Sequence, residues 1–167
     1  MRVSASTIII GASIVISASF ARQLMDLLKS YLGDRGFFFL IGVLFIGFIL
    51  VFLIYVIKNN HPGVFRSILL LFILIIGLTL MWKIKIIEER IHILEYGLLG
   101  WFAARDLILR RNKTKGVILA CALVGIFGII DEVFQKILPY RVGEARDVVL
   151  NGLGGLWGIS LYITAQK

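Results

Sequence analysis

The sequence predicts an all-α fold, a bundle of about six transmembrane helices that forms a single domain over residues 1–167. Of the 167 residues, 59% are hydrophobic and the mean hydropathy is +0.96, whereas a typical soluble domain has about 45–50% apolar residues. Residues 37–57 carry no charge and residues 65–82 carry only Arg66. Each run approaches the roughly 20 apolar residues that a helix needs to cross the hydrocarbon core. Membrane-spanning β-strands would instead alternate in polarity over short stretches.

The apolar runs follow one another with short polar connections between them. The expected helices are residues 3–20, 37–57, 65–82, 91–109, 116–137 and 146–163. The first run follows a basic residue and ends in small residues, so we expect it to act as a signal anchor as well as a span. The mixed-charge segment 22–35 is a connector that can continue as an amphipathic helix through Leu24, Leu27 and Leu28. Residues 58–63 are rich in turn formers and end the second helix.

Charge and cysteine content narrow the classes of partner and cofactor. The formal net charge of +8 in so apolar a chain indicates topology and contact with anionic lipid headgroups, not nucleic acid binding. Cys121 is the single cysteine, which excludes an intrachain disulfide and a cysteine-based metal site. We therefore expect membrane lipids as partners and no cofactor, and a larger membrane protein complex remains open as a partner.

The orientation follows from the charges in the loops. With six spans, the N-terminus, the second and fourth connections and the C-terminus share one side of the membrane. The basic residues divide equally between the two sides, but all except one of the ten acidic residues fall on the other side. Because the orientation rule counts bases in short loops, the basic connection 110–115 decides. We expect an integral protein of the cell (inner) membrane with both termini in the cytoplasm.

Polar residues gather on three of the expected helices at the same, extracytoplasmic end. His92, Glu95 and Tyr96 recur at helical spacing, and so do Asp131 and Gln135 further along the chain. Ionisable groups at membrane depth are costly unless they are paired, so we expect these faces to point toward one another. The predicted ligand-binding or structural polar network comprises Arg90, His92, Glu95, Tyr96, Asp131, Glu132, Gln135, Arg141, Asp147 and Asn151.

The order and spacing of these residues resemble those of a known family. Arg90-x-His92-x-x-Glu95-Tyr96-x-x-Leu99-Gly100 resembles the first motif of the VanZ-like family. Asp131-Glu132-x-x-Gln135-x-x-x-Pro139-x-Arg141, followed by Asp147-x-x-x-Asn151-x-x-Gly154, resembles its second motif. The VanZ-like motif region covers residues 88–158. The chain departs from the family pattern at Tyr140, where glycine is frequent, and Arg90 matches the basic position only approximately.

The resemblance implies a polytopic membrane protein of the cell envelope. The family is named for a protein associated with low-level resistance to the glycopeptide teicoplanin, and the resemblance does not by itself imply an enzyme. The residues that it supports as a site are His92, Tyr96, Asp131, Glu132, Gln135 and Asp147.

The residues leave more than one role open. We favour a non-catalytic accessory or binding role, with an ionic network that fixes the helices. The alternative is a membrane enzyme for a lipid-linked or peptidoglycan-related substrate, with His92 as proton carrier and Asp131 or Glu132 as its partner. In such an enzyme Arg90 and Arg141 could hold a phosphate or carboxylate.

Two further possibilities carry less weight. We expect no metal, although Asp131, Glu132 and Asp147, with His92, have the chemistry to bind a divalent ion. A transporter is disfavoured because the charges cluster at one surface, whereas transporter sites lie near the midplane.

The orientation can be tested with a reporter fused directly after Lys113. We expect a cytoplasmic reporter such as green fluorescent protein to be active there, and alkaline phosphatase, which needs export, to be inactive. The same pair fused after Arg35 serves as the control and should give the reverse result. Alkaline phosphatase activity after Lys113 would invert the predicted topology.

Overall fold

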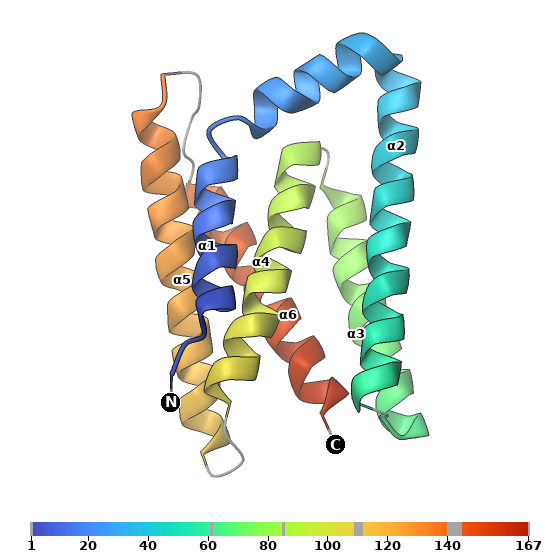
Figure 1. Cartoon of the computed structure of the whole chain (residues 1–167), viewed down its shortest axis with the longest axis vertical. Helices are drawn as coiled ribbons and strands as arrows, with labels where there is room; N and C mark the ends of the chain where they lie inside the picture. Colours follow the sequence, from blue (N-terminus) through green and yellow to red (C-terminus); the bar gives the residue numbers. More distant parts are fainter. Residues whose placement is uncertain (1, 61, 85, 109–111, 140–144, 167) are drawn as a thin grey trace.

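The computed structural model describes residues 2–60, 62–84, 86–108, 112–139 and 145–166 as a helical bundle (Figure 1). The helices are α1 (Ala5–Ser17), α2 (Ala21–Asn60), α3 (Val64–Lys83), α4 (Ile87–Leu107), α5 (Lys113–Ile137) and α6 (Ala145–Ala165). The predicted all-α class and six helices are confirmed over these residues. The bounds shift from the expected ones by a few residues, except that the connector 22–35 joins the second helix.

Four of these helices, α2, α3, α5 and α6, are long and apolar enough to cross a membrane. The protein is thus an integral membrane protein, with four candidate spans where about six were predicted. The two remaining helices fall short for different physical reasons. With 13 residues, α1 is too short by itself. In contrast, α4 has 21 residues but carries acidic and basic side chains near both ends.

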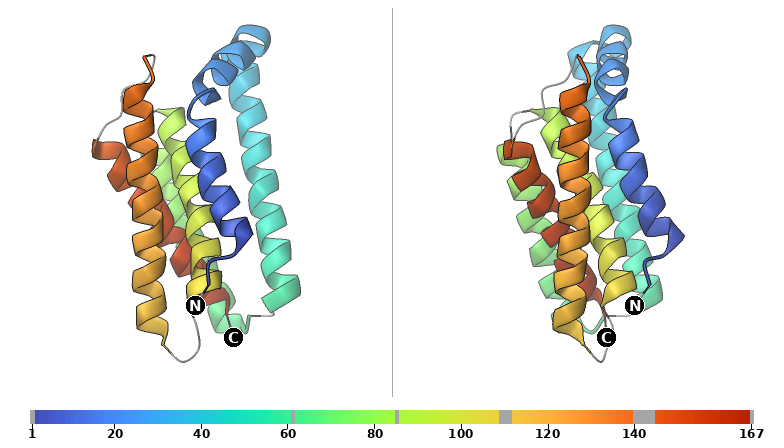
Figure 2. Two further views of the ribbon diagram at one scale, coloured as in Figure 1. Left: turned by 60° about the vertical axis from the view of Figure 1, so that its left-hand side comes forward. Right: turned by 90° about the vertical axis from the view of Figure 1, so that its left-hand side faces the viewer.

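The charged helix α4 lies at the centre of the bundle. It packs most extensively against α6, and further against α5, α1 and α3, and Figures 1 and 2 show α1, α5 and α6 around it. Tyr96, Leu99 and Ala103 on α4 are fully buried, and they cluster with Ala120 and Val124 of α5. The neighbouring helices therefore shield α4 from lipid, which explains why its polar side chains are tolerated.

Glycines let the backbones of α4 and α6 approach closely. A Cβ added at Gly158 would collide with the carbonyl group of Gly97, and one added at Gly100 would collide with the backbone of Gly155. At Gly154 an added Cβ would lie 2.7 Å from the carbonyl oxygen of Ile93. Gly154 and Gly158 thus bring α6 into close contact with the glycine-bearing face of α4, as small residues do between membrane helices.

A kink divides α2 into two arms. Gly33 has a φ of 65° and a ψ of 169°, a left-handed conformation that glycine adopts without steric cost. The first arm is the expected amphipathic connector, which passes over one end of the bundle before the second arm runs back along it (Figures 1 and 2). Met25 and Phe37, on either side of the kink, are buried with Ile87 of α4 and hold the bend in place.

A partly buried carboxylate fastens the start of α1 to the end of α4. Oδ2 of Asp106 accepts hydrogen bonds from the hydroxyl groups of Ser4 and Thr7, both at 2.6 Å, and Oδ1 accepts from Arg105 at 3.0 Å. Hydrogen bonds of this kind stabilise the ionised form of a carboxylate.

Different helix ends lie at the two ends of the bundle. The first and last described residues lie at one end, together with the end of α2, the start of α3, the end of α4 and the start of α5 (Figure 1). At the other end lie the first arm of α2, the start of α4, the end of α5 and the start of α6. The polar residues singled out in the sequence thus belong to helix segments near one end.

The close contact between α4 and α6 can be tested by adding single methyl groups. We expect Gly158→Ala to lower the free energy of unfolding by about 1–3 kcal/mol, because its Cβ would press on the backbone of α4. Gly152→Ala on the same helix is the control, since no described residue beyond its own turn of the helix comes within 4 Å of the added Cβ. Thermal unfolding in detergent measures both variants, and equal midpoints would contradict the close packing.

Candidate functional site

The predicted polar residues lie at a common depth below one end of the bundle. At a rise of about 1.5 Å per residue, His92 and Tyr96 lie roughly 8 and 14 Å from the first residue of α4. Asp131 lies roughly 9 Å before the end of α5, and Asn151 lies the same distance into α6. The helices thus bring together residues that are up to 59 positions apart in the sequence.

Tyr96 and Asp131 form the most deeply buried contact of the site. The Tyr96 hydroxyl group donates to Oδ2 of Asp131 at 3.1 Å, and it also lies 3.2 Å from the carbonyl oxygen of Phe127. Both residues are fully buried. A buried carboxylate without a hydrogen-bond donor would cost several kcal/mol, so this hydroxyl group ties the middle of α4 to α5.

His92 lies between two carboxylates. Its Nδ1 atom is 3.7 Å from Oδ2 of Asp131 and 3.7 Å from Oε2 of Glu95. These distances suit ion pairs with a protonated imidazole and exceed those of strong hydrogen bonds. Oε1 of Glu95 also lies 3.5 Å from the hydroxyl group of Ser17, so the cluster reaches the last residue of α1.

The remaining predicted residues of α5 and α6 lie beside this cluster. Gln135 donates to Glu132 at 3.5 Å, and both side chains are buried. Asn151 is fully buried, and neither its amide nitrogen nor its amide oxygen has a hydrogen-bond partner among the described residues. Its Cβ lies close to Gly128, while Asp147 lies one turn nearer the end of the bundle and is half-buried.

The arginines are arranged differently from the sequence-based expectation. Arg90 donates from Nε to the carbonyl oxygen of Ile84 at 2.7 Å, and so ties α4 to the end of α3. Arg146 instead forms an ion pair with Glu89 at 3.0 Å, joining the starts of α4 and α6. Neither residue belongs to the polar network predicted from the sequence, and their opposite charges are the only sequence signal of the pair. Arg141 lies outside the described residues.

The chemistry available to this cluster is proton exchange and cohesion. A histidine beside two carboxylates can exchange a proton with either of them. Within the described part of the chain, no group of three or more histidine, cysteine, aspartate or glutamate side chains is arranged to hold a metal ion. The carboxylates of Asp131, Glu132 and Asp147 therefore do not converge there as a ligand set.

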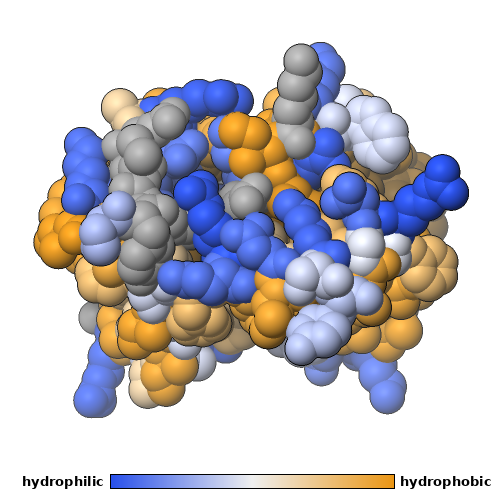
Figure 3. Space-filling model, turned by 90° about the horizontal axis from the view of Figure 1, so that it is seen from above, coloured by the Kyte–Doolittle hydropathy of each residue, from blue (hydrophilic) through white to orange (hydrophobic). Residues whose placement is uncertain are grey.

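The end of the bundle above the cluster is polar. Figure 3 shows hydrophilic side chains across this end, with hydrophobic residues around much of its margin. Arg22, Asp26, Asp34 and Arg35 on α2 are exposed there, as is Arg146 on α6. The buried cluster is thus covered by a charged surface that suits a membrane–water interface.

Comparison with known proteins supports the likeness noted in the sequence. The family model described as VanZ/LLP1 matches residues 12–166, which include all of α2 and α3 as well as the motif region 88–158. No curated protein and no solved structure matches the chain.

The buried Tyr96–Asp131 contact can be tested with Tyr96→Phe. Loss of the hydroxyl group leaves the buried Asp131 without this donor, so we expect the free energy of unfolding to fall by about 0.5–1.5 kcal/mol. Tyr162→Phe is the matched control, because the Tyr162 hydroxyl group makes no hydrogen bond to a described residue. Unfolding midpoints measured in the same detergent compare the two, and an equal loss in both would count against the contact.

Proposed function

Because the chain belongs to the VanZ/LLP1 family, we propose that this membrane protein has a non-catalytic accessory or binding role in the cell envelope. The polar cluster of His92, Glu95, Tyr96 and Asp131 holds the helices together, and the charged surface above it meets an envelope component. The susceptibility of cells to a glycopeptide such as teicoplanin is the phenotype by which this role can be measured. The same role is compatible with a place as accessory subunit of a larger membrane complex.

We further propose that all six helices cross the membrane, with both termini in the cytoplasm. The helix α4 has the length of a span, and its polar residues are covered by neighbouring helices. The short helix α1 lies against α4 and α5, within a bundle whose other members are candidate spans. The basic α4–α5 connection favours the cytoplasm for that end, which puts the polar cluster on the extracytoplasmic side.

Burial is the observation that carries the non-catalytic role. Asp131 is fully buried, and Glu132 and His92 are 3% and 8% exposed. A substrate that reached these groups would have to displace the packed side chains around them. Contacts from α4 to α5 and from α4 to α1 pass through the cluster, so its removal affects how three helices fit together.

One observation favours the enzymatic alternative. His92 lies at the same distance from the carboxylates of Asp131 and Glu95, an arrangement that suits general acid–base chemistry. In that case His92 would transfer the proton, and a lipid-linked or peptidoglycan-related molecule would approach from the polar end. The two roles differ in what a substitution at the site does to folding.

Asp131→Asn separates the two roles. We expect this near-isosteric change to weaken the pairing with His92 and Tyr96, to lower the unfolding midpoint and to reduce the amount of protein in the membrane severalfold. Membrane abundance, the midpoint in detergent and teicoplanin susceptibility would be measured in the same cells. Asp34→Asn, the same chemical change at an exposed position of that end, is the control and should leave all three unchanged.

A catalytic site predicts another outcome for the same variants. If Asp131→Asn and His92→Ala accumulate and unfold like the unmodified protein but abolish the envelope phenotype, the non-catalytic role is wrong. Loss of abundance in step with loss of phenotype supports the cohesive role.

A further inference from the structure

The second arm of α2 stands apart from the rest of the bundle. Only 6% of the residues in its most apolar stretch are buried. It contacts the other helices mainly through the buried residues Phe37, near the kink, and Val56, near its end. Between these two points, the ring of Phe52 packs edge to face against the indole of Trp101, with 4.9 Å between the ring centroids. Large side chains, and not closely packed backbones, therefore fill part of the gap between α2 and the bundle.

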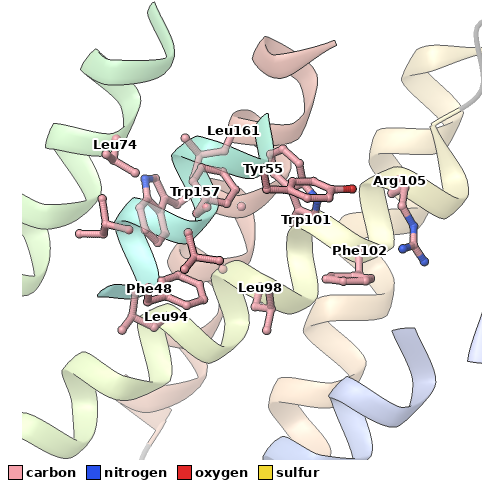
Figure 4. Close-up of a pocket in the computed structure, with 15 residues that line it drawn as sticks. Phe48, Tyr55, Leu74, Leu94, Leu98, Trp101, Phe102, Arg105, Trp157 and Leu161 are labelled. Atoms are coloured by element: carbon pink, nitrogen blue, oxygen red, sulfur yellow. The ribbon is translucent and has the colours of Figure 1, made fainter. Parts of the chain in front are cut away.

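A cavity of about 260 Å³ lies in this gap, between the second arm of α2 and helices α3, α4 and α6 (Figure 4). Its walls are mostly apolar, and both aromatic and aliphatic side chains line it, with Phe48, Leu74 and Leu98 among them. Trp157 also lines it, and its indole nitrogen donates to the carbonyl oxygen of Ile73 at 2.9 Å. The one polar atom of that indole is therefore satisfied, and the wall stays apolar.

The shape and surroundings of the cavity favour a lipid chain. Apolar cavities do not hold ordered water, because water there lacks hydrogen-bond partners. The volume lies below the roughly 300–1,000 Å³ of sites for drug-sized ligands, which suits one flexible chain. The lining residues of α2 and α6 come from the half of each helix that points toward the end of the bundle where both chain termini lie. The cavity is therefore at the depth of the acyl chains in the membrane leaflet at that end.

A basic side chain lies at the margin of the cavity. Arg105 is among its lining residues, and its guanidinium group lies 4.5 Å from the ring centre of Phe102. Nε and Nη2 of Arg105 bind Asp106, and Nη2 also binds Ser4 and Ser6. No hydrogen bond joins Nη1 to a described residue, so that nitrogen keeps its two donors for a ligand.

The rest of this end is basic as well. Lys58 and Arg66 flank the connection between α2 and α3 and are exposed, and Lys113 and Lys115 are exposed at the start of α5. Basic residues near a membrane surface attract anionic headgroups, each by about 1 kcal/mol. We infer that the cavity binds one acyl chain of an anionic phospholipid, whose phosphate lies at Nη1 of Arg105.

The tryptophans of the cavity provide a direct test in the full chain. Trp82 is 82% exposed on α3 and would be replaced by phenylalanine, so that Trp101 and Trp157 report from the cavity. The protein is reconstituted into phosphatidylcholine vesicles that contain a small fraction of chain-brominated phosphatidylglycerol or chain-brominated phosphatidylcholine. Bromine quenches tryptophan fluorescence on contact. We expect saturable quenching with about fivefold preference for the anionic lipid.

Variants separate the chain contact from the headgroup contact. Leu98→Phe fills the cavity and should remove the saturable quenching. Ile126→Phe introduces the same aromatic side chain on the exposed face of α5 and should retain the quenching. Arg105→Gln should abolish the preference for phosphatidylglycerol. Lys83→Gln removes a positive charge from an exposed position at the opposite end of the bundle and should keep the preference.

Quenching measured without any substitution in the cavity tests the proposal even where a cavity variant fails to fold. Equal, unsaturable quenching by the two brominated lipids overturns it, since that is the behaviour of bulk lipid contact. Absence of quenching together with a dimer in native mass spectrometry also overturns it, and would assign the gap beside α2 to a second copy of the chain.

Discussion

The close approach of α4 and α6 is the contact on which the rest of the structure depends. Their backbones meet where glycines face each other, so α4 sits at the centre instead of at the lipid-facing rim. A central α4 can carry a histidine and carboxylates at membrane depth, because α1, α5 and α6 separate them from hydrocarbon. Gly97 and Gly158 also line the apolar cavity, and the same contact therefore shapes both the polar and the apolar site.

The two sites differ in polarity and in position along the bundle. Toward one end, His92 and Asp131 belong to a buried network in which hydroxyl, imidazole and carboxylate groups face one another. Toward the other end, apolar and aromatic side chains enclose a cavity, and Arg105 is the one charged residue among the described residues that line it. The first arrangement restrains the helices that compose it, since separating them would expose charges to lipid. In the second, α2 stands off far enough to leave room for a chain.

Anchoring of the ends completes this arrangement. Asp106 gathers hydroxyl groups from the start of α1, and the pair of Glu89 and Arg146 joins α4 to α6 at the opposite end. Both anchors involve α4, so this helix is held at its two ends and along its glycine-bearing face. Such a helix offers a rigid support for a binding surface, which agrees with an accessory or binding role better than with a site that must open for each substrate.

The sequence by itself determined the helical class, the order of the helices and the end at which His92, Tyr96 and Asp131 meet. Apolar run length and helical spacing are local properties, and an alternating path through a bundle brings the ends of successive helices together. Only the tertiary structure decided that α4 is central, that Arg90 binds a backbone carbonyl group, and that α2 stands apart. These depend on which faces pack and at what distance, and a long arginine has several partners within reach. Four of the six helices have the length and polarity of spans by themselves. The helix α4 does not, because its own sequence lacks a continuous apolar surface, and the neighbouring helices bury its polar side chains instead.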